Sequence, residues 1–198
     1  MEQKRNVAIL IFDEVEVLDF CGPFEVFGVT GYQNGTEPFD VYTVAEEMRP
    51  VIARNGLSIN PAHTIADCPR PDVLVVPGGL GARKEMDNPI LREWIEERAK
   101  ETELTLSVCT GALMLAKAGL LEGLSATTHR NGMELLKELA PATTIEEERR
   151  FVDNGRIILS AGISAGIDAS LHTVAKLLGT EQALETARYM EYEWEPVP

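Results

Sequence analysis

The sequence predicts an α/β fold: a three-layer sandwich in which helices cover both faces of a mostly parallel sheet. Two observations carry this prediction. Apolar runs of strand length alternate with amphipathic runs of helical length, an order typical of βαβ units. The run at residues 73–76 is apolar at every position, as expected of a central parallel strand covered on both faces. The chain has 198 residues, so we expect residues 1–198 to form a single domain.

The elements follow in a regular order. Three strand runs each precede a helical run: residues 6–12 and 18–29, 72–76 and 89–100, and 104–108 and 112–121. Asp153-Asn154-Gly155 predicts a small antiparallel hairpin, and Asn55-Gly56 predicts a second short pair within residues 51–61. Gly179 separates the last two helices, and the charge run at residues 146–150 is interpreted as a solvated strand face. We therefore expect a flavodoxin-like sheet.

Charge and cysteine content exclude several classes of partner. The chain has 18 Lys and Arg against 32 Asp and Glu, a net charge of -14, which repels nucleic acid and anionic membranes. Apolar runs such as residues 7–12 are far shorter than the roughly 18 residues of a membrane span, and no secretory leader is recognised. Three cysteines without a CxxC pair suit a reducing compartment. We expect a cytoplasmic protein.

A cysteine stands where the strand run at residues 104–108 gives way to a helical run. Cys109-Thr110-Gly111 has the spacing of a nucleophile elbow with sulfur in place of oxygen. Gly111 permits a sharp turn, and the positive end of the following helix favours thiolate over thiol. Cys109 is therefore a candidate nucleophile. The alternative, a small buried apolar residue, is equally compatible with the sequence.

Two further motifs are expected at the same edge of the sheet. Gly78 and Gly79 follow a strand and expose backbone N–H groups that can form an oxyanion hole with the Thr110 N–H, although a plain loop fits as well. Asp19 opens the first helix between two apolar residues. If it faces Cys109, burial keeps it partly protonated and able to move a proton; the alternative is a first-turn acid that stabilises the helix.

The remaining candidates are weaker. His129 follows the strand-like residues 126–128 and is predicted to orient or assist the thiolate. Gly162 and Ile163 lie in a glycine-rich segment that either walls a substrate pocket or allows helix and sheet to pack closely. His, Cys and carboxylate residues show no metal-ligand spacing, so we expect neither a metal nor an organic cofactor.

Several of these motifs, taken together, resemble the ThiJ/PfpI superfamily of class I glutamine amidotransferase-like folds. They occur in the order Val76-Pro77-Gly78-Gly79, Ser107-Val108-Cys109-Thr110-Gly111, Ala118-Gly119-Leu120-Leu121, Ala126-Thr127-Thr128-His129 and Gly162-Ile163-Ser164-Ala165-Gly166. Within that group the chain is most similar to the isocyanide hydratases, whose Leu-Asp and Cys-Thr-Gly motifs fall on Leu18-Asp19 and Cys109-Thr110-Gly111.

The resemblance implies a function and a mechanism. It makes Cys109 the nucleophile and Asp19 its acid/base partner in adding water to an isocyanide, a small-molecule substrate, to give an N-substituted formamide. Thr110 replaces the histidine that typically follows the cysteine in protease and glyoxalase members, which disfavours peptidase activity, and no downstream His-x-Glu pair serves a glutamine amidotransferase. Related transcription regulators add a DNA-binding domain; since the sequence stops at Pro198 and is acidic, we do not expect such a domain here. A homodimer is expected.

Other activities stay open at this point. The same thiolate could serve a glyoxalase or deglycase acting on a 2-oxoaldehyde, or an intracellular amidase or protease of the same family. A non-enzymatic role is the second alternative: Cys109 would then be a reversible redox sensor, or the domain a small-molecule-binding protein.

Overall fold

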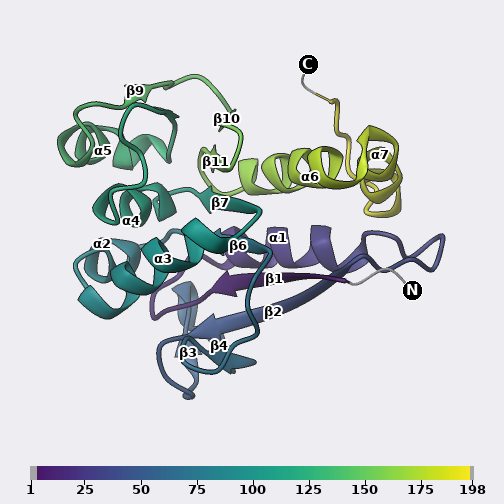
Figure 1. Cartoon of the computed structure of the whole chain (residues 1–198), viewed down its shortest axis with the longest axis horizontal. Coiled ribbons are helices and arrows are strands. Elements are labelled where there is room, and N and C mark those ends of the chain that lie inside the picture. Colours follow the sequence, from purple (N-terminus) through teal and green to yellow (C-terminus); the bar gives the residue numbers. More distant parts are fainter. Residues whose placement is uncertain (1–3, 197–198) are drawn as a thin grey trace.

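The computed structural model describes residues 4–196 and has a seven-stranded sheet at its centre (Figure 1). The strands are ordered β10 (Phe151–Asp153), β11 (Ile157–Ser160), β7 (Leu104–Val108), β6 (Val73–Val76), β1 (Arg5–Leu10), β2 (Phe39–Ala45) and β5 (His63–Thr64). All neighbouring strands pair in parallel except β10 and β11, which pair antiparallel. The predicted α/β class with a small antiparallel hairpin is confirmed.

Helices cover both faces of this sheet (Figure 1). On one face α1 (Val17–Val29) packs with α6 (Ala165–Leu178) and α7 (Thr180–Tyr189). On the other, α4 (Gly111–Lys117) packs with α2 (Ala82–Glu85), α3 (Pro89–Glu101) and α5 (Met133–Leu139). No helix within residues 4–196 is long and apolar enough to span a bilayer.

The sequence explains why these segments fold as they do. Every residue of β6 and β7 is buried, which is the expected consequence of helices on both faces. Asn88 caps α3 by accepting hydrogen bonds from the N–H groups of Ile90 and Leu91, and Pro89 occupies the first helical position. Gly179, with a φ of 96°, separates α6 from α7. Truncating a fully buried strand residue such as Leu106 to alanine would cost about 2–5 kcal/mol.

Two short pairs lie outside the main sheet. The predicted pair around Asn55-Gly56 forms β3 (Val51–Ile52) and β4 (Ser58–Ile59), which are antiparallel. The strand expected before His129 is only β8 (Ser125–Ala126), which pairs with β9 (Thr144–Ile145) away from the main sheet. His129 therefore does not end a strand of the main sheet.

Two other expectations differ from the structure. The charge run at residues 146–150 is a turn and not a strand face, because pairing with β11 begins only at Phe151. The helix expected to reach residue 121 ends at Lys117, and Gly119 then turns the chain with a φ of 72°. Since β1, β6 and β7 are parallel, their carboxyl ends meet at one edge of the sheet, which is where open α/β sheets bind ligands.

Candidate active site

Cys109 immediately follows β7, and both its backbone N–H and its backbone carbonyl form hydrogen bonds. Its N–H donates to the carbonyl oxygens of Ser160 (3.2 Å) and Ala161 (3.1 Å), and its own carbonyl accepts a 2.6 Å hydrogen bond from Thr128 Oγ1. The φ of 56° places this non-glycine residue in the left-handed region, a conformation that costs about 1–3 kcal/mol and persists where neighbours fix it. A left-handed residue between β7 and α4 is compatible with the sharp turn that the sequence predicts, and the role of Cys109 as a nucleophile stays a prediction.

The elbow is locked against the loop that follows β6. A Cβ added to Gly111 would lie 2.0 Å from the Val76 carbonyl oxygen, so only glycine lets α4 begin this close to the neighbouring strand. Thr110 Oγ1 accepts from the Gly79 N–H at 3.0 Å and is also 3.1 Å from the Gly79 carbonyl. The Thr110 side chain therefore joins the two loops, which makes it a positioning group in this structure.

Asp19 lies in the first turn of α1 and is completely buried. Its Oδ2 accepts a 3.1 Å hydrogen bond from the Gly78 N–H, and the Cys109 thiol is its other hydrogen-bonding neighbour. Its Oδ1 has no well-aligned partner within residues 4–196. The structure thus brings Asp19 against Cys109 instead of solvent and leaves one carboxyl oxygen available for proton exchange.

Burial controls the protonation of both groups. It raises the pKa of Asp19 to about 7, against the lowering effect of hydrogen bonds from Cys109 and Gly78. Burial, followed by repulsion from the Asp19 carboxylate, raises the pKa of Cys109 to about 12, although the N–H groups of Thr110 and Ile163 hydrogen-bond to the sulfur and favour the thiolate. Both shifts disfavour a resting state in which Cys109 and Asp19 are ionised together.

Burial and Asp19 oppose the effect expected of the helix after Cys109, so ionisation of the thiol by that helix stays a prediction. The helix α4 has only seven residues, and its positive end acts on a sulfur whose pKa burial and an adjacent carboxyl both raise. Cys109 and Asp19 behave as a coupled pair, in which ionising one group disfavours ionising the other. The thiolate can form in this environment when the proton remains on Asp19.

The role expected of Gly78 and Gly79 also changes. Their N–H groups do not point freely into a cavity as oxyanion donors would, because Gly78 donates to Asp19 and Gly79 donates to Thr110. A Cβ on Gly78 would lie 2.4 Å from the Thr110 backbone nitrogen and 3.0 Å from Asp19 Oδ2. These glycines position the acid and the elbow, and the N–H groups that face the sulfur are those of Thr110 and Ile163.

His129 and the Gly162-Ile163 segment form the other side of the site. A Cβ on Gly162 would lie 2.2 Å from His129 Cδ2, so close packing explains this glycine. The His129 Nδ1 accepts from the Asn131 N–H at 3.2 Å, and its pKa is lowered by burial and by the nearby cations Arg130 and Arg83. Within the described chain no hydrogen bond joins His129 to Cys109. Its assistance of the thiolate stays a prediction.

A cavity of about 520 Å³, here called the thiol hollow, opens beside this segment. It is lined by residues 128–130, 133, 147–150 and 161–165. Three of its lining residues, Thr128, Ala161 and Ile163, hydrogen-bond to Cys109. The hollow therefore lies beside the candidate nucleophile, although Cys109 is not itself among its lining residues.

Sequence reasoning missed the charged groups around this hollow. Arg130 and the turn at residues 147–150 line it, and half-buried Glu16 is close enough to influence both Asp19 and His129. The available signals were weak: a charge run read as a strand face, and an acid three residues before Asp19.

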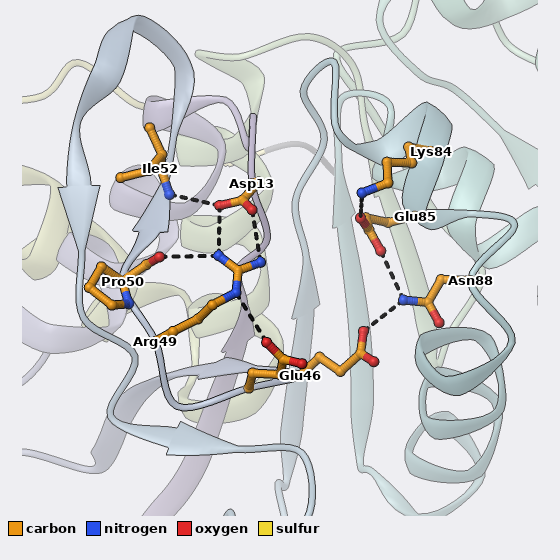
Figure 2. Close-up of polar contacts among 9 residues, drawn as sticks. Asp13, Glu46, Arg49, Pro50, Ile52, Lys84, Glu85 and Asn88 are labelled. Atoms are coloured by element: carbon orange, nitrogen blue, oxygen red, sulfur yellow. Dashed lines mark hydrogen bonds and ion pairs between the residues drawn. The ribbon is translucent and has the colours of Figure 1, made fainter.

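A second hollow, here called the charged hollow, lies at the carboxyl ends of β1 and β2 and has a volume of about 360 Å³ (Figure 2). Arg49 forms two hydrogen bonds to the Asp13 carboxylate, the shorter at 2.8 Å. The Asn88 side-chain nitrogen donates to Glu46 (2.7 Å) and to Glu85 (2.9 Å), which joins the strand ends to the helices as Figure 2 shows. No group of three or more potential metal ligands occurs within residues 4–196.

Comparison with known sequences matches the profile of the DJ-1/PfpI family over residues 5–176. An isonitrile hydratase from Pseudomonas putida is 34% identical over 187 residues, which cover 94% of this chain and 78% of that protein. The HTH-type transcriptional regulator GbdR of Pseudomonas aeruginosa is 25% identical over 194 residues, which cover 96% of this chain but 52% of the regulator. The chain thus spans about half the length of that regulator.

Solved structures show the same fold. A ThiJ/PfpI family protein from Pseudomonas syringae superposes with a TM-score of 0.87 and 31% identity, over 98% of this chain and 77% of that one. Drosophila melanogaster DJ-1beta superposes with a TM-score of 0.83 and 20% identity, over 96% of this chain and 100% of that one. At that identity the second likeness shows the fold alone.

Proposed function

Because this chain belongs to the DJ-1/PfpI family, we propose that it is an enzyme that uses Cys109 to add water to an isocyanide, releasing an N-substituted formamide. The observation that carries the proposal is the coupled pair of Cys109 and Asp19 at the end of β7, buried together beside the thiol hollow. The 34% identity to an isonitrile hydratase supports the same substrate class.

The first half of the reaction uses the proton that the pair shares. With the proton on Asp19, the Cys109 thiolate attacks the terminal carbon of the isocyanide and forms a carbon–sulfur bond. Asp19 transfers its proton to that carbon as the electron pair develops there. The products of this step are a thioimidate on Cys109 and an ionised Asp19. The raised pKa of Asp19, about 7, lets the carboxyl act as an acid at neutral pH.

The second half regenerates the enzyme. The Asp19 carboxylate takes a proton from water, whose oxygen attacks the thioimidate carbon. Asp19 then passes this proton to the substrate nitrogen, the carbon–sulfur bond breaks, and the sulfur leaves with its electron pair. Transfer of one proton back to the pair releases the formamide and restores the starting state. The N–H groups of Thr110 and Ile163, which face the sulfur, stabilise the thiolate in both halves.

Formamide production from an alkyl isocyanide tests this proposal. We expect Cys109→Ala and Asp19→Ala each to lower kcat/KM by at least about 1,000-fold, because each removes a group that makes or breaks bonds. Cys68→Ala is the matched control: Cys68 is a half-buried free cysteine in another part of the chain, so activity should stay within a factor of about two. An active Cys109→Ala enzyme would rule out covalent catalysis.

A small-molecule-binding domain without turnover is the second candidate, favoured by the match to a regulator about twice as long. The raised pKa of Cys109 disfavours a redox sensor, which depends on a readily formed thiolate. Saturable binding of an isocyanide, with no formamide produced by the wild type, would favour the binding domain over the enzyme.

A further inference from the structure

The thiol hollow carries local positive charge in a chain whose net charge is -14. Among its charged lining residues, Arg150 is paired with Asp168, and Glu147 is paired with Lys137. The remaining lining charges are Arg130, Arg149 and Glu148, for which no ion pair exists within residues 4–196. Two guanidinium groups and one carboxylate are therefore left without an internal counter-ion.

The nearby groups outside the lining do not reverse this sign. The Arg83 guanidinium donates to the Asn131 carbonyl at 3.0 Å, so it approaches the hollow from α2 without a carboxylate partner. Glu16 approaches from the start of α1, also without an ion pair in the described chain. Counting Arg83, Arg130 and Arg149 against Glu16 and Glu148 leaves an excess of one positive charge beside the candidate nucleophile.

We propose that the thiol hollow selects substrates whose substituent carries a negative charge, such as a carboxylate, and that Arg130 and Arg149 receive that charge. Guanidinium groups suit this task because they bind carboxylates through paired N–H donors. That the substrate reacts through an isocyano group rests on the function proposed above. The preference for a negatively charged substituent rests only on the hollow and its charged residues. Glu148 opposes the same charge and weakens the preference.

Alkylation of Cys109 tests the preference without requiring any turnover. Iodoacetate and iodoacetamide attack through the same carbon and release iodide from the same thiolate, but only iodoacetate is negatively charged. The ratio of their rates at Cys109, followed by peptide mass analysis, therefore cancels the ionisation of the thiol and reports the charge preference of the hollow. We expect Arg130→Gln and Arg149→Gln each to lower this ratio about three- to tenfold.

Matched controls separate local from overall charge. Arg188→Gln changes net charge equally at an exposed side chain of α7, which lines a surface hollow together with Leu178 at the far end of α6. Arg188 has no ion pair in residues 4–196. It should leave the ratio within a factor of about two. Glu148→Gln should raise the ratio. The wild-type ratio should fall as ionic strength rises. Equal ratios in wild type, Arg130→Gln and Arg149→Gln would overturn the proposal, as would an absence of any reaction at Cys109.

A second readout links the preference to the proposed reaction. Isocyanoacetate is a negatively charged substrate, and its methyl ester is the matched neutral one. The wild type should show the lower KM for isocyanoacetate. The double variant Arg130→Gln/Arg149→Gln should show the lower KM for the ester. If neither compound is hydrated, the proposed function fails while the alkylation ratio still decides the charge preference. If the ester is hydrated with the lower KM, the preference fails while the function stands.

Discussion

The thiol hollow and the charged hollow lie at the same edge of the sheet but differ in how completely their charged groups are paired. In the charged hollow each acid and base has a partner: Arg49 is paired with Asp13, Glu85 with Lys84, and Glu46 is bound by Asn88 (Figure 2). Beside Cys109, Asp19 is buried without a cation. Paired charges hold strand ends and helices together, whereas a buried acid with a raised pKa can bind and release a proton near neutral pH.

Among changes that leave both Cys109 and Asp19 in place, the largest expected effect comes from disturbing the contact between the acid and the elbow. Gly78→Ala would place a methyl group 2.4 Å from the Thr110 nitrogen and 3.0 Å from Asp19 Oδ2, so the two loops must separate. We expect kcat/KM for isocyanide hydration to fall at least about 100-fold and the free energy of unfolding to fall by about 1–3 kcal/mol. Enzyme assay and urea denaturation measure the two effects.

Gly28→Ala is the control for this change. No atom lies within 4 Å of a Cβ at Gly28, which sits within α1, so activity should be retained and stability should rise by about 0.5–1 kcal/mol. Full activity in Gly78→Ala would contradict the positioning role assigned to that glycine.

The next effect concerns the pH dependence of stability. The pKa of Asp19 is raised to about 7 in the folded protein, so between pH 4 and pH 7 the folded state holds a proton that the unfolded state releases. This group therefore destabilises the wild type progressively as pH rises through that window. Asp19→Asn lacks the titration, and its stability relative to wild type should improve by up to roughly 4 kcal/mol between pH 4 and pH 8.

Urea denaturation of both proteins at a series of pH values measures this difference, because titrating groups that do not interact with Asp19 cancel in the comparison. Stability curves that run parallel from pH 4 to pH 8 would show that the Asp19 carboxyl is not desolvated in the folded protein.

The smallest effect is expected in the charged hollow, with the opposite sign. Arg49 lowers the pKa of Asp13, so the pair stabilises the protein above the usual Asp pKa and loses that contribution as pH falls through the lower folded value. Both side chains are well exposed, at 52% and 39%, and solvent screens the pair. Asp13→Asn should lower Tm by no more than about 3 °C at pH 7 and leave hydration activity unchanged.

Thermal denaturation and a standard activity assay check this prediction. A large loss of activity in Asp13→Asn would mean that the charged hollow takes part in the reaction and would remove the contrast between the two regions.

The sequence was sufficient to predict the elements that depend on local pattern. The uninterrupted apolar run of β6, the Asn-Gly turns and the Cys109-Thr110-Gly111 spacing each report local requirements, and the structure has the strands and turns that they predict. The antiparallel hairpin followed from Asp153-Asn154-Gly155 for the same reason.

The protonation and charge of the site could not be predicted in this way because they depend on contacts between distant segments. Asp19 and Gly78 are 59 positions apart in the sequence, and the fold brings them together. The Gly78 N–H therefore hydrogen-bonds to Asp19 and is not free for a substrate. Burial and Asp19 raise the pKa of Cys109 against the effect of the local helix, and both causes come from distant segments. Arg149 lies in a charge run that looks solvated in sequence, and only the folded turn brings it to the thiol hollow.

The most direct test of the coupled pair is titration of the Cys109 thiol in wild type and Asp19→Asn. The rate at which iodoacetamide alkylates Cys109 is measured as a function of pH, and its midpoint gives the pKa of the thiol. We expect a wild-type midpoint well above the ordinary range of about 8.5–9, and a lower midpoint in Asp19→Asn because the repelling carboxylate is gone. A wild-type midpoint at or below the ordinary value, or one that Asp19→Asn leaves unchanged, would contradict this expectation.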